Sequence, residues 1–203
     1  MVKIKFPDGA IRSYESGLTP YEIASSISSG LARSIISSDF NGQKIETTTQ
    51  IFDDGNLTFY TWRDNEGKEA FWHSTAHLLA QVLEEFYDGI KLTIGPAISN
   101  GFYYDVDFGE HSMSEKDFLK IEKRMIEIAR EKHEFKLRSI SKKEALDFYK
   151  KNRNQYKTEL IENLKDGEIT FCDHDNFTDL CRGGHIPHTG LIKAVKLMSV
   201  AGA

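Results

Sequence analysis

The alternation of apolar and charged residues at the start of the chain constrains its fold most strongly. The run VKIKF puts Val2, Ile4 and Phe6 on one face, as in a half-buried strand. The turn sequence PDG then leads into AIRSY, a second strand-like run. Residues 2–14 therefore predict an N-terminal β-hairpin.

A helix and two further strands are predicted after this hairpin. Thr19, Pro20 and Glu22 form the sequence of a capping box, with Thr19 as N-cap and Pro20 in the first turn. We expect this helix to end near Gly30, which can take the left-handed C-cap conformation. Strand-like RSIIS, an Asn41-Gly42 turn and LTFYTW follow. The order predicts a small β-grasp domain of ubiquitin type over residues 1–62, without a catalytic constellation.

A second domain, residues 63–203, is predicted to be α+β. The polar run RDNEGKE (63–69) is expected to be a linker, followed by a helix over roughly 70–87. KLTIGPAISNGFYYDVDF predicts a hairpin, and FKLRSI a short strand. Ser114 with Asp117 and Ser141 with Glu144 predict two helix starts. The first of these helices has an apolar stripe of Phe118, Ile121, Met125 and Ile128.

Composition narrows the class of protein. The chain has 203 residues, 39% of them hydrophobic and 28% charged, as in soluble globular proteins. No apolar run approaches the roughly 20 residues of a membrane span, and the N-terminus lacks the apolar core of a signal peptide. Only Cys172 and Cys181 are present, so a disulfide framework is not expected. We therefore expect a cytoplasmic protein.

Charge is unevenly distributed along the chain. The net charge is −5, which argues against indiscriminate binding of nucleic acid. Residues 116–157 nevertheless hold 14 of the 26 Lys and Arg and 7 of the 31 Asp and Glu, a local charge of +7. This stretch predicts either a docking region for a phosphate backbone or a solvated helix face with mixed charges.

Two pairs of residues offer metal-ligating or catalytic side chains. His73 and His77 are four positions apart, which puts them on one face of the predicted helix. They lack the glutamate of the zinc-protease motif. Cys181 and His185 are separated by three residues, including Gly183 and Gly184. Together the four side chains are suited by type to tetrahedral zinc, but a gap of about 100 residues means that the fold must join the pairs.

The order of these motifs resembles a known family. HxxxH followed by CxxxH resembles the editing domain shared by threonyl-tRNA and alanyl-tRNA synthetases and free-standing aminoacyl-tRNA deacylases. FPDG, NGQ, HSTAHLLA, IGPAISNGFYYDVD, IEKRM, QYK, DLCRGGH and KLMSVAGA resemble bacterial threonyl-tRNA synthetases in their order along the chain. The family often has proline where this chain has Gly184.

The resemblance implies an N-terminal region, a ubiquitin-like TGS domain plus an editing domain. In this family a class II core with ATP and a catalytic zinc, and an anticodon-binding domain, would follow. The fragment is therefore expected to be a monomer without ligase activity. Its expected activity is hydrolysis of Ser-tRNA(Thr), with the acceptor end of the tRNA as partner and no membrane.

The resemblance also implies a set of site residues. The editing positions map onto His73, His77, Tyr104, Lys157, Asp179, Cys181 and His185. His73 is expected to act as base or to contact the ribose, and His77 and His185 to shape a water site. Lys157 would supply positive charge, Asp179 would hold the serine ammonium, and Cys181 would be a pocket donor.

Several alternatives stay open at this point. Tyr104 would pack beside the base or the amino acid, and Arg182 is a further candidate for phosphate contact. We expect editing without a metal, with zinc at His73, His77, Cys181 and His185 as the alternative. A free-standing zinc-dependent deacylase and a non-enzymatic RNA-binding or regulatory module are the competing functions.

Overall fold

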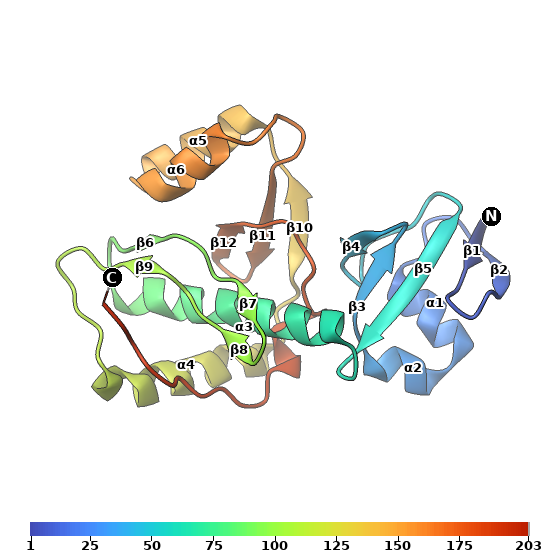
Figure 1. Ribbon diagram of the computed structural model, residues 1–203, viewed down its shortest axis with the longest axis horizontal. Helices are drawn as coiled ribbons and strands as arrows, with labels where there is room; N and C mark the ends of the chain where they lie inside the picture. Colours follow the sequence, from blue (N-terminus) through green and yellow to red (C-terminus); the bar gives the residue numbers. More distant parts are fainter. Residues whose placement is uncertain (203) are drawn as a thin grey trace. The chain divides into compact units, whose positions relative to one another are not determined.

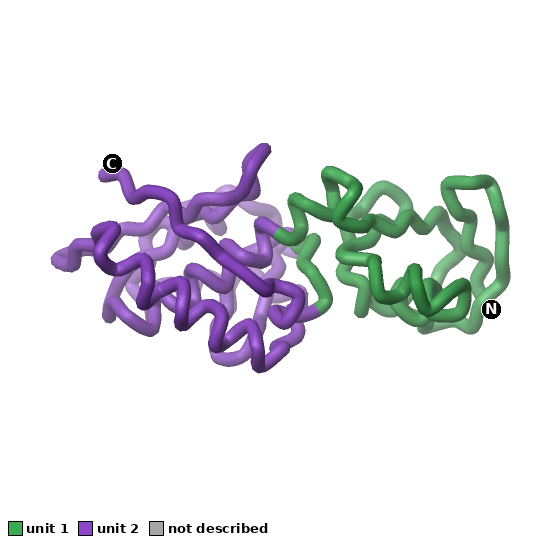
Figure 2. Tube along the Cα trace, turned by 90° about the horizontal axis from the view of Figure 1, so that it is seen from below, with its two compact units in different colours: residues 1–71, 183–187 green, residues 72–182, 188–203 purple. Residues whose placement is uncertain are grey.

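The computed structural model describes residues 1–202 and consists of two compact units (Figure 2). Unit 1 comprises residues 1–71 and 183–187, and unit 2 comprises residues 72–182 and those from 188 onward. The short segment 183–187 thus belongs to unit 1, although it lies far along the sequence from the rest of that unit.

Unit 1 is a five-stranded sheet with two helices (Figure 1). Its elements are β1 (Val2–Lys5), β2 (Ile11–Tyr14), α1 (Pro20–Ile27), α2 (Ser29–Ser34), β3 (Ile35–Phe40), β4 (Gln43–Ile45) and β5 (Gly55–Thr61). The strand order is β2-β1-β5-β3-β4, with β1 parallel to β5 and the other pairs antiparallel. Ile23 of α1 packs with Val2, Ile4 and Leu57 of the sheet. The predicted β-grasp fold is confirmed.

Two local predictions in unit 1 are confirmed in detail. The hydroxyl of Thr19 accepts a hydrogen bond from the backbone N–H of Glu22, and the Glu22 carboxylate accepts one from the N–H of Thr19. Asn41 and Gly42 both have positive φ, 54° and 83°, as a two-residue hairpin turn requires. That turn joins β3 to β4 at the pair Phe40 and Gln43.

The first helix ends beside the SSG run, as predicted, but the predicted C-cap at Gly30 is wrong. The helix α1 ends at Ile27, and Ser28 has an extended backbone that stops it. The Ser28 hydroxyl then accepts from the N–H of Leu31 at 3.0 Å and so caps α2. Gly30 lies inside α2 and does not end a helix. Ser28 therefore ends one helix and begins a second, short helix that was not predicted.

The predicted linker is also wrong, because five of its residues begin a helix. The helix α3 (Asn65–Phe86) starts well before residue 70. The Asp64 carboxylate accepts from the N–H of Thr61 at 2.7 Å, and the Asp64 carbonyl accepts from the N–H of Lys68. A Cβ on Gly67 would lie 2.1 Å from the Thr61 carbonyl oxygen. The glycine in this polar run allows the first turn of α3 to pack on the end of β5.

Unit 2 is α+β, as predicted. Its further elements are β6 (Lys91–Leu92), β7 (Ala97–Ile98), β8 (Gly101–Phe102), β9 (Val106–Asp107), a 3-10 turn (Glu115–Asp117), α4 (Phe118–Glu131), β10 (Lys136–Ser139), α5 (Lys142–Lys151), α6 (Gln155–Glu162), β11 (Thr170–His174), β12 (Phe177–Leu180) and a second 3-10 turn (Thr189–Leu191). The strands β10, β11 and β12 form an antiparallel sheet, and two short hairpins pair β7 with β8 and β6 with β9.

Most local predictions in unit 2 are confirmed. Both capping boxes are present, at Ser114 and at Ser141. The apolar stripe of α4, Phe118, Ile121, Met125 and Ile128, is buried. The helix α6 and the β11–β12 hairpin were not predicted, because both are short and their polar residues mask any clear period. Among the helices of residues 1–202, none is long and apolar enough to cross a membrane.

Candidate functional site

The predicted histidine pair lies on α3. His73 and His77 are one turn apart, and their rings meet edge to face with centroids 4.7 Å apart. Both are held within unit 2, where the ring of His77 also contacts Phe177. His77 is buried and His73 is partly buried. The i, i+4 spacing therefore brings two imidazoles together, as the sequence indicated.

Three donor atoms converge at this pair. Nε2 of His73 lies 3.0 Å from Sγ of Cys181 and 3.3 Å from Nε2 of His77. Nδ1 of His73 lies 3.3 Å from the carbonyl oxygen of Gly95. A carbonyl can only accept, so Nδ1 carries a proton and Nε2 of a neutral His73 carries the lone pair. Cys181 and His73 are 108 residues apart, and the fold of unit 2 joins them.

A second cluster surrounds the buried carboxylate of Asp179. Oδ1 lies 2.6 Å from Nζ of Lys157 and accepts a hydrogen bond from the hydroxyl of Tyr149 at 3.2 Å. Oδ2 accepts from the hydroxyl of Tyr104 at 2.6 Å and lies 3.7 Å from Nδ1 of His77. The carboxylate thus links the histidine pair to a deeply buried cation, since the Lys157 side chain is 3% exposed.

Both tyrosines of this cluster act as donors. Burial, and then the nearby Asp179 charge, raise the pKa of Tyr104 well above its ordinary value. The same causes raise the pKa of Tyr149 well above its ordinary value. The phenols therefore keep their protons and donate hydrogen bonds to the Asp179 carboxylate. Tyr149 also accepts from the backbone N–H of Leu180 at 2.7 Å, which ties α5 to β12.

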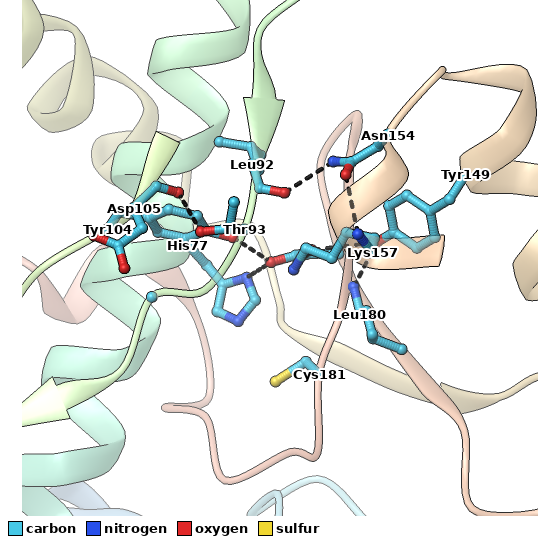
Figure 3. Close-up of polar contacts among 12 residues, drawn as sticks. His77, Leu92, Thr93, Tyr104, Asp105, Tyr149, Asn154, Lys157, Leu180 and Cys181 are labelled. Atoms are coloured by element: carbon cyan, nitrogen blue, oxygen red, sulfur yellow. Dashed lines mark hydrogen bonds and ion pairs between the residues drawn. The ribbon is translucent and has the colours of Figure 1, made fainter. Parts of the chain in front are cut away.

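Local structure explains why Lys157 points to this cluster. The Asn154 side chain accepts from the N–H of Lys157 at 3.0 Å and so caps α6. Its amide also donates to the carbonyl of Leu92 at 2.8 Å. Asn154 therefore fixes the first turn of α6 to the β6 segment. Figure 3 shows Lys157 on α6 and His77 on α3 pointing toward one another.

His185 lies in unit 1, where it is buried against a residue that sequence reasoning missed. Its Nδ1 lies 3.0 Å from Oε1 of Glu46, and the same oxygen accepts from the N–H of Gly184 at 3.1 Å. Glu46 follows β4, and 139 residues separate it from His185. Three residues separate His185 from Cys181, so their Cα atoms are at most about 14 Å apart.

One further predicted residue is exposed, and three residues of the site were not predicted. Arg182 is exposed, as a phosphate contact requires. Tyr149 and Glu46 were missed because a tyrosine on an amphipathic helix and a glutamate in a loop have no local signal. Gly95 was also missed. A Cβ on Gly95 would lie 2.3 Å from the ring of Tyr104, a conflict visible only in the fold.

The distances between the candidate metal-binding atoms can be compared with those of a tetrahedral zinc site. His73, His77, Cys181 and His185 together form a group that could hold a metal ion. Two imidazoles on tetrahedral zinc would have nitrogens about 3.3 Å apart, and an imidazole and a thiolate would lie about 3.5 Å apart. The observed 3.3 Å between the histidines fits, and the 3.0 Å from His73 to Cys181 must lengthen slightly. All four residues therefore fit zinc by type, and His73, His77 and Cys181 fit it nearly by spacing.

Comparison with known proteins identifies two domains. Residues 2–61 match the model of the TGS domain, and residues 169–202 match that of the threonyl and alanyl tRNA synthetase second additional domain. The ubiquitin-like and editing-type architecture predicted above is confirmed. Both matched segments fall on the elements just described, β1 to β5 in the first case and the region from β11 onward in the second.

The whole chain also aligns with curated ligases. It is 65% identical over 203 residues to the threonine–tRNA ligase of Flavobacterium johnsoniae and 63% identical to that of Flavobacterium psychrophilum. The identity to the threonine–tRNA ligase of Cytophaga hutchinsonii is 53%. The alignments cover 31%, 31% and 32% of these relatives, so the chain spans about a third of their length.

Proposed function

We propose that this chain, which carries a TGS domain together with a threonyl and alanyl tRNA synthetase second additional domain, is the editing region of a threonine–tRNA ligase. It hydrolyses the ester of Ser-tRNA(Thr). In the longer protein that its relatives represent, it would accompany the ATP-dependent attachment of threonine to tRNA(Thr). The observation that carries the proposal is the convergence of His73, His77 and Cys181 in this domain.

The chemical need for such a site follows from the two amino acids. Serine is threonine without one methyl group, and a contact to one methyl is worth only about 1–3 kcal/mol. A ligase that selected its amino acid by binding alone would therefore attach serine to tRNA(Thr) too often. A separate site that hydrolyses the wrong ester restores accuracy.

His73 is the residue best placed to activate water. Its Nδ1 donates to the Gly95 carbonyl, so Nε2 is the basic nitrogen of the ring and would take a proton from an attacking water. His77 and Cys181 border the same position at 3.3 and 3.0 Å from Nε2. They would orient the water, and Cys181 would act as a pocket donor and not as a nucleophile. His185 would complete the water site.

Lys157 and Asp179 would bind the substrate as a pair. A carboxylate has about four lone-pair positions, and Tyr104, Tyr149 and Lys157 occupy three around Asp179. One position remains for the ammonium group of the seryl ester. The charge of Lys157, held at 2.6 Å from Asp179, would stabilise the oxyanion that forms at the ester carbonyl.

Zinc is the alternative to water-only chemistry at this site. His73, His77, Cys181 and His185 would hold it, and when bound it would polarise the ester carbonyl and acidify a water. Zinc quantification of the purified protein, with hydrolysis measured before and after chelation, separates the two. We expect activity that resists the chelator, whereas loss on chelation and recovery with zinc would establish a metal site.

The partner in this proposal is the acceptor end of tRNA(Thr). The exposed Arg182 directly follows the site residue Cys181, so its guanidinium can contact a phosphate of that end. An Arg182→Gln variant tests this contact, since it should raise KM for the tRNA and leave kcat almost unchanged.

Release of serine from Ser-tRNA(Thr) tests the function directly, with Thr-tRNA(Thr) as the matched substrate. We expect release from the seryl ester and little from the threonyl ester. His73→Ala and Cys181→Ala should each lower the rate by about 100-fold or more. The exposed His111, in a loop of the same unit, supplies a matched control as His111→Ala. Equal release from both esters, or none, would contradict the proposal.

A further inference from the structure

Glu46 is a buried carboxylate that the chemistry described above does not use. It is 3% exposed, lies just after β4 and belongs to the segment that matches the TGS domain. Burying a carboxylate is costly unless hydrogen bonds replace its hydration. Here one oxygen, Oε1, accepts from both Gly184 and His185.

The two donors come from one short loop. Gly183 and Gly184 have φ values of 89° and 86°, a conformation that side chains with a Cβ rarely adopt. Gly184 donates its N–H to Glu46 at 3.1 Å, and a proline there could neither donate nor take this φ. The glycine at position 184 therefore suits this contact with Glu46.

The contact decides which nitrogen of His185 carries the proton. Nδ1 lies 3.0 Å from Oε1 of Glu46, and a carboxylate only accepts. Nδ1 of His185 therefore carries hydrogen, and Nε2 carries the lone pair of the neutral ring. A carboxylate that holds an imidazole at one nitrogen fixes both its tautomer and its orientation.

We infer that Glu46 is a positioning residue for the editing site: it sets the tautomer of His185 and holds the 183–187 loop through Gly184. The inference rests on the proposed function of His185. Both residues of the contact belong to unit 1, so the geometry that fixes the ring is complete within that unit. The requirement is the same for a water or a zinc ion, since both need the lone pair on Nε2.

The tautomer can be read directly by NMR of the chain labelled with 15N at its histidines. In the wild-type protein we expect the His185 ring to carry its proton on Nδ1. Glu46→Met removes the acceptor and keeps a buried, flexible side chain, so the Nδ1–H form should lose its dominance. Glu46→Gln keeps an acceptor oxygen and should preserve it. Glu69→Met, at an exposed glutamate of the same unit, is the matched control.

Activity supplies a second and separate readout. Loss of a group that orients a site histidine typically costs about 10- to 100-fold, and we expect this loss in kcat for Glu46→Met, with KM for the tRNA unchanged. Glu46→Gln should retain most of the activity. If wild type releases no serine, the proposed function fails, but the tautomer result still decides the role of Glu46.

Two results would overturn the inference. One is a wild-type His185 protonated on Nε2 in the folded chain, a measurement that needs no variant to fold. The other is a folded Glu46→Met protein, checked by circular dichroism, in which the His185 tautomer and kcat match those of wild type. Either result would reduce Glu46 to a structural residue of the loop.

Discussion

Two imidazoles of this chain, His73 and His185, are each held at Nδ1 by an acceptor from a distant segment. The acceptor is the Gly95 carbonyl for His73 and the Glu46 carboxylate for His185. Each contact leaves the lone pair on Nε2, the nitrogen that a water or a metal needs. Under the proposed function, both histidines would therefore depend on partners that themselves do no chemistry.

Asp179→Asn tests the buried ion pair at this scale. Lys157 is 3% exposed, so removing its counter-charge leaves an uncompensated buried cation. We expect a loss of about 3–5 kcal/mol in the free energy of unfolding. Urea unfolding followed by the fluorescence of Trp72, in a Trp62→Phe background, reports on unit 2.

The matched control is the double variant Asp179→Asn with Lys157→Met. It removes both charges, so it should recover most of the stability that the single variant lacks. A double variant no more stable than Asp179→Asn alone would contradict this electrostatic explanation.

Glu84, on α3, gives a prediction for pH. Burial and the nearby Asp179 raise the pKa of Glu84 to about 7, while Lys157 opposes the shift. Because its folded pKa is raised, the folded chain holds this proton more tightly than the unfolded chain. The stability that this group contributes is present at low pH and is lost as pH rises toward 7 and above. Part of the Glu84 residue still contacts solvent, which screens the charge and keeps the effect on stability small.

Glu84→Gln should therefore gain stability relative to wild type between pH 5 and pH 8. Urea midpoints of both proteins at the two pH values measure the difference. Glu110→Gln, at an exposed loop position, is the control and should show a smaller change. A Glu84→Gln difference that stays constant with pH would contradict the raised pKa.

At the scale of elements, the segment from β6 to β9 places two parts of the site. It supplies the Gly95 carbonyl that orients His73 and the Tyr104 hydroxyl that donates to Asp179. The Gly95 carbonyl and the Tyr104 hydroxyl are positioned together, because the Tyr104 ring packs directly against the Gly95 backbone. A short hairpin region with little regular structure is therefore as important for the site as the long helix α3.

Gly95→Ala should disturb this arrangement. The added Cβ would lie 2.3 Å from the Tyr104 ring, so the ring or the backbone must move, at a cost of about 1–3 kcal/mol. We expect serine release to fall as well, since His73 and Asp179 both lose a partner. Gly30→Ala is the control: a Cβ there would lie 3.9 Å from the Ser28 hydroxyl oxygen, an ordinary contact, so the change in α2 should be neutral or stabilising. Equal stability of the two variants would contradict the packing argument.

At the scale of the whole molecule, ion pairs engage part of the basic stretch 116–157. Lys120, Lys123 and Arg124 of α4 all pair with acidic side chains. The exposed Lys150, Lys151 and Arg153 lie around the turn between α5 and α6, and they form no ion pair within residues 1–202. This turn directly precedes the helix that carries Lys157.

Replacing Lys150, Lys151 and Arg153 by Gln should weaken binding of tRNA(Thr). Removing one phosphate interaction lowers the slope of log K against log salt by about 0.7 to 0.9, so the slope should fall by about 2 to 3. Fluorescence anisotropy at several salt concentrations measures it. The control replaces Lys120 and Lys123 on α4 by Gln, and a larger effect there would locate the tRNA on α4 instead.

Much of the fold could be predicted because the signals are local. Thr19 and Glu22, or Asn41 and Gly42, act within three residues of one another, so their chemistry is readable from the sequence. Predictions were wrong where one residue serves two elements, as Ser28 does, or where close packing decides, as at Gly67.

Spacing along the chain was enough to indicate the residue types of the site, His73 with His77 and Cys181 with His185. Their partners depend on the three-dimensional fold. Cys181 meets His73 across 108 residues, and Glu46 meets His185 across 139. No local pattern marks a glutamate in a loop as the acceptor for a distant imidazole. Such contacts follow from the packing of each unit, because burial leaves a polar group only the partners that the fold brings to it.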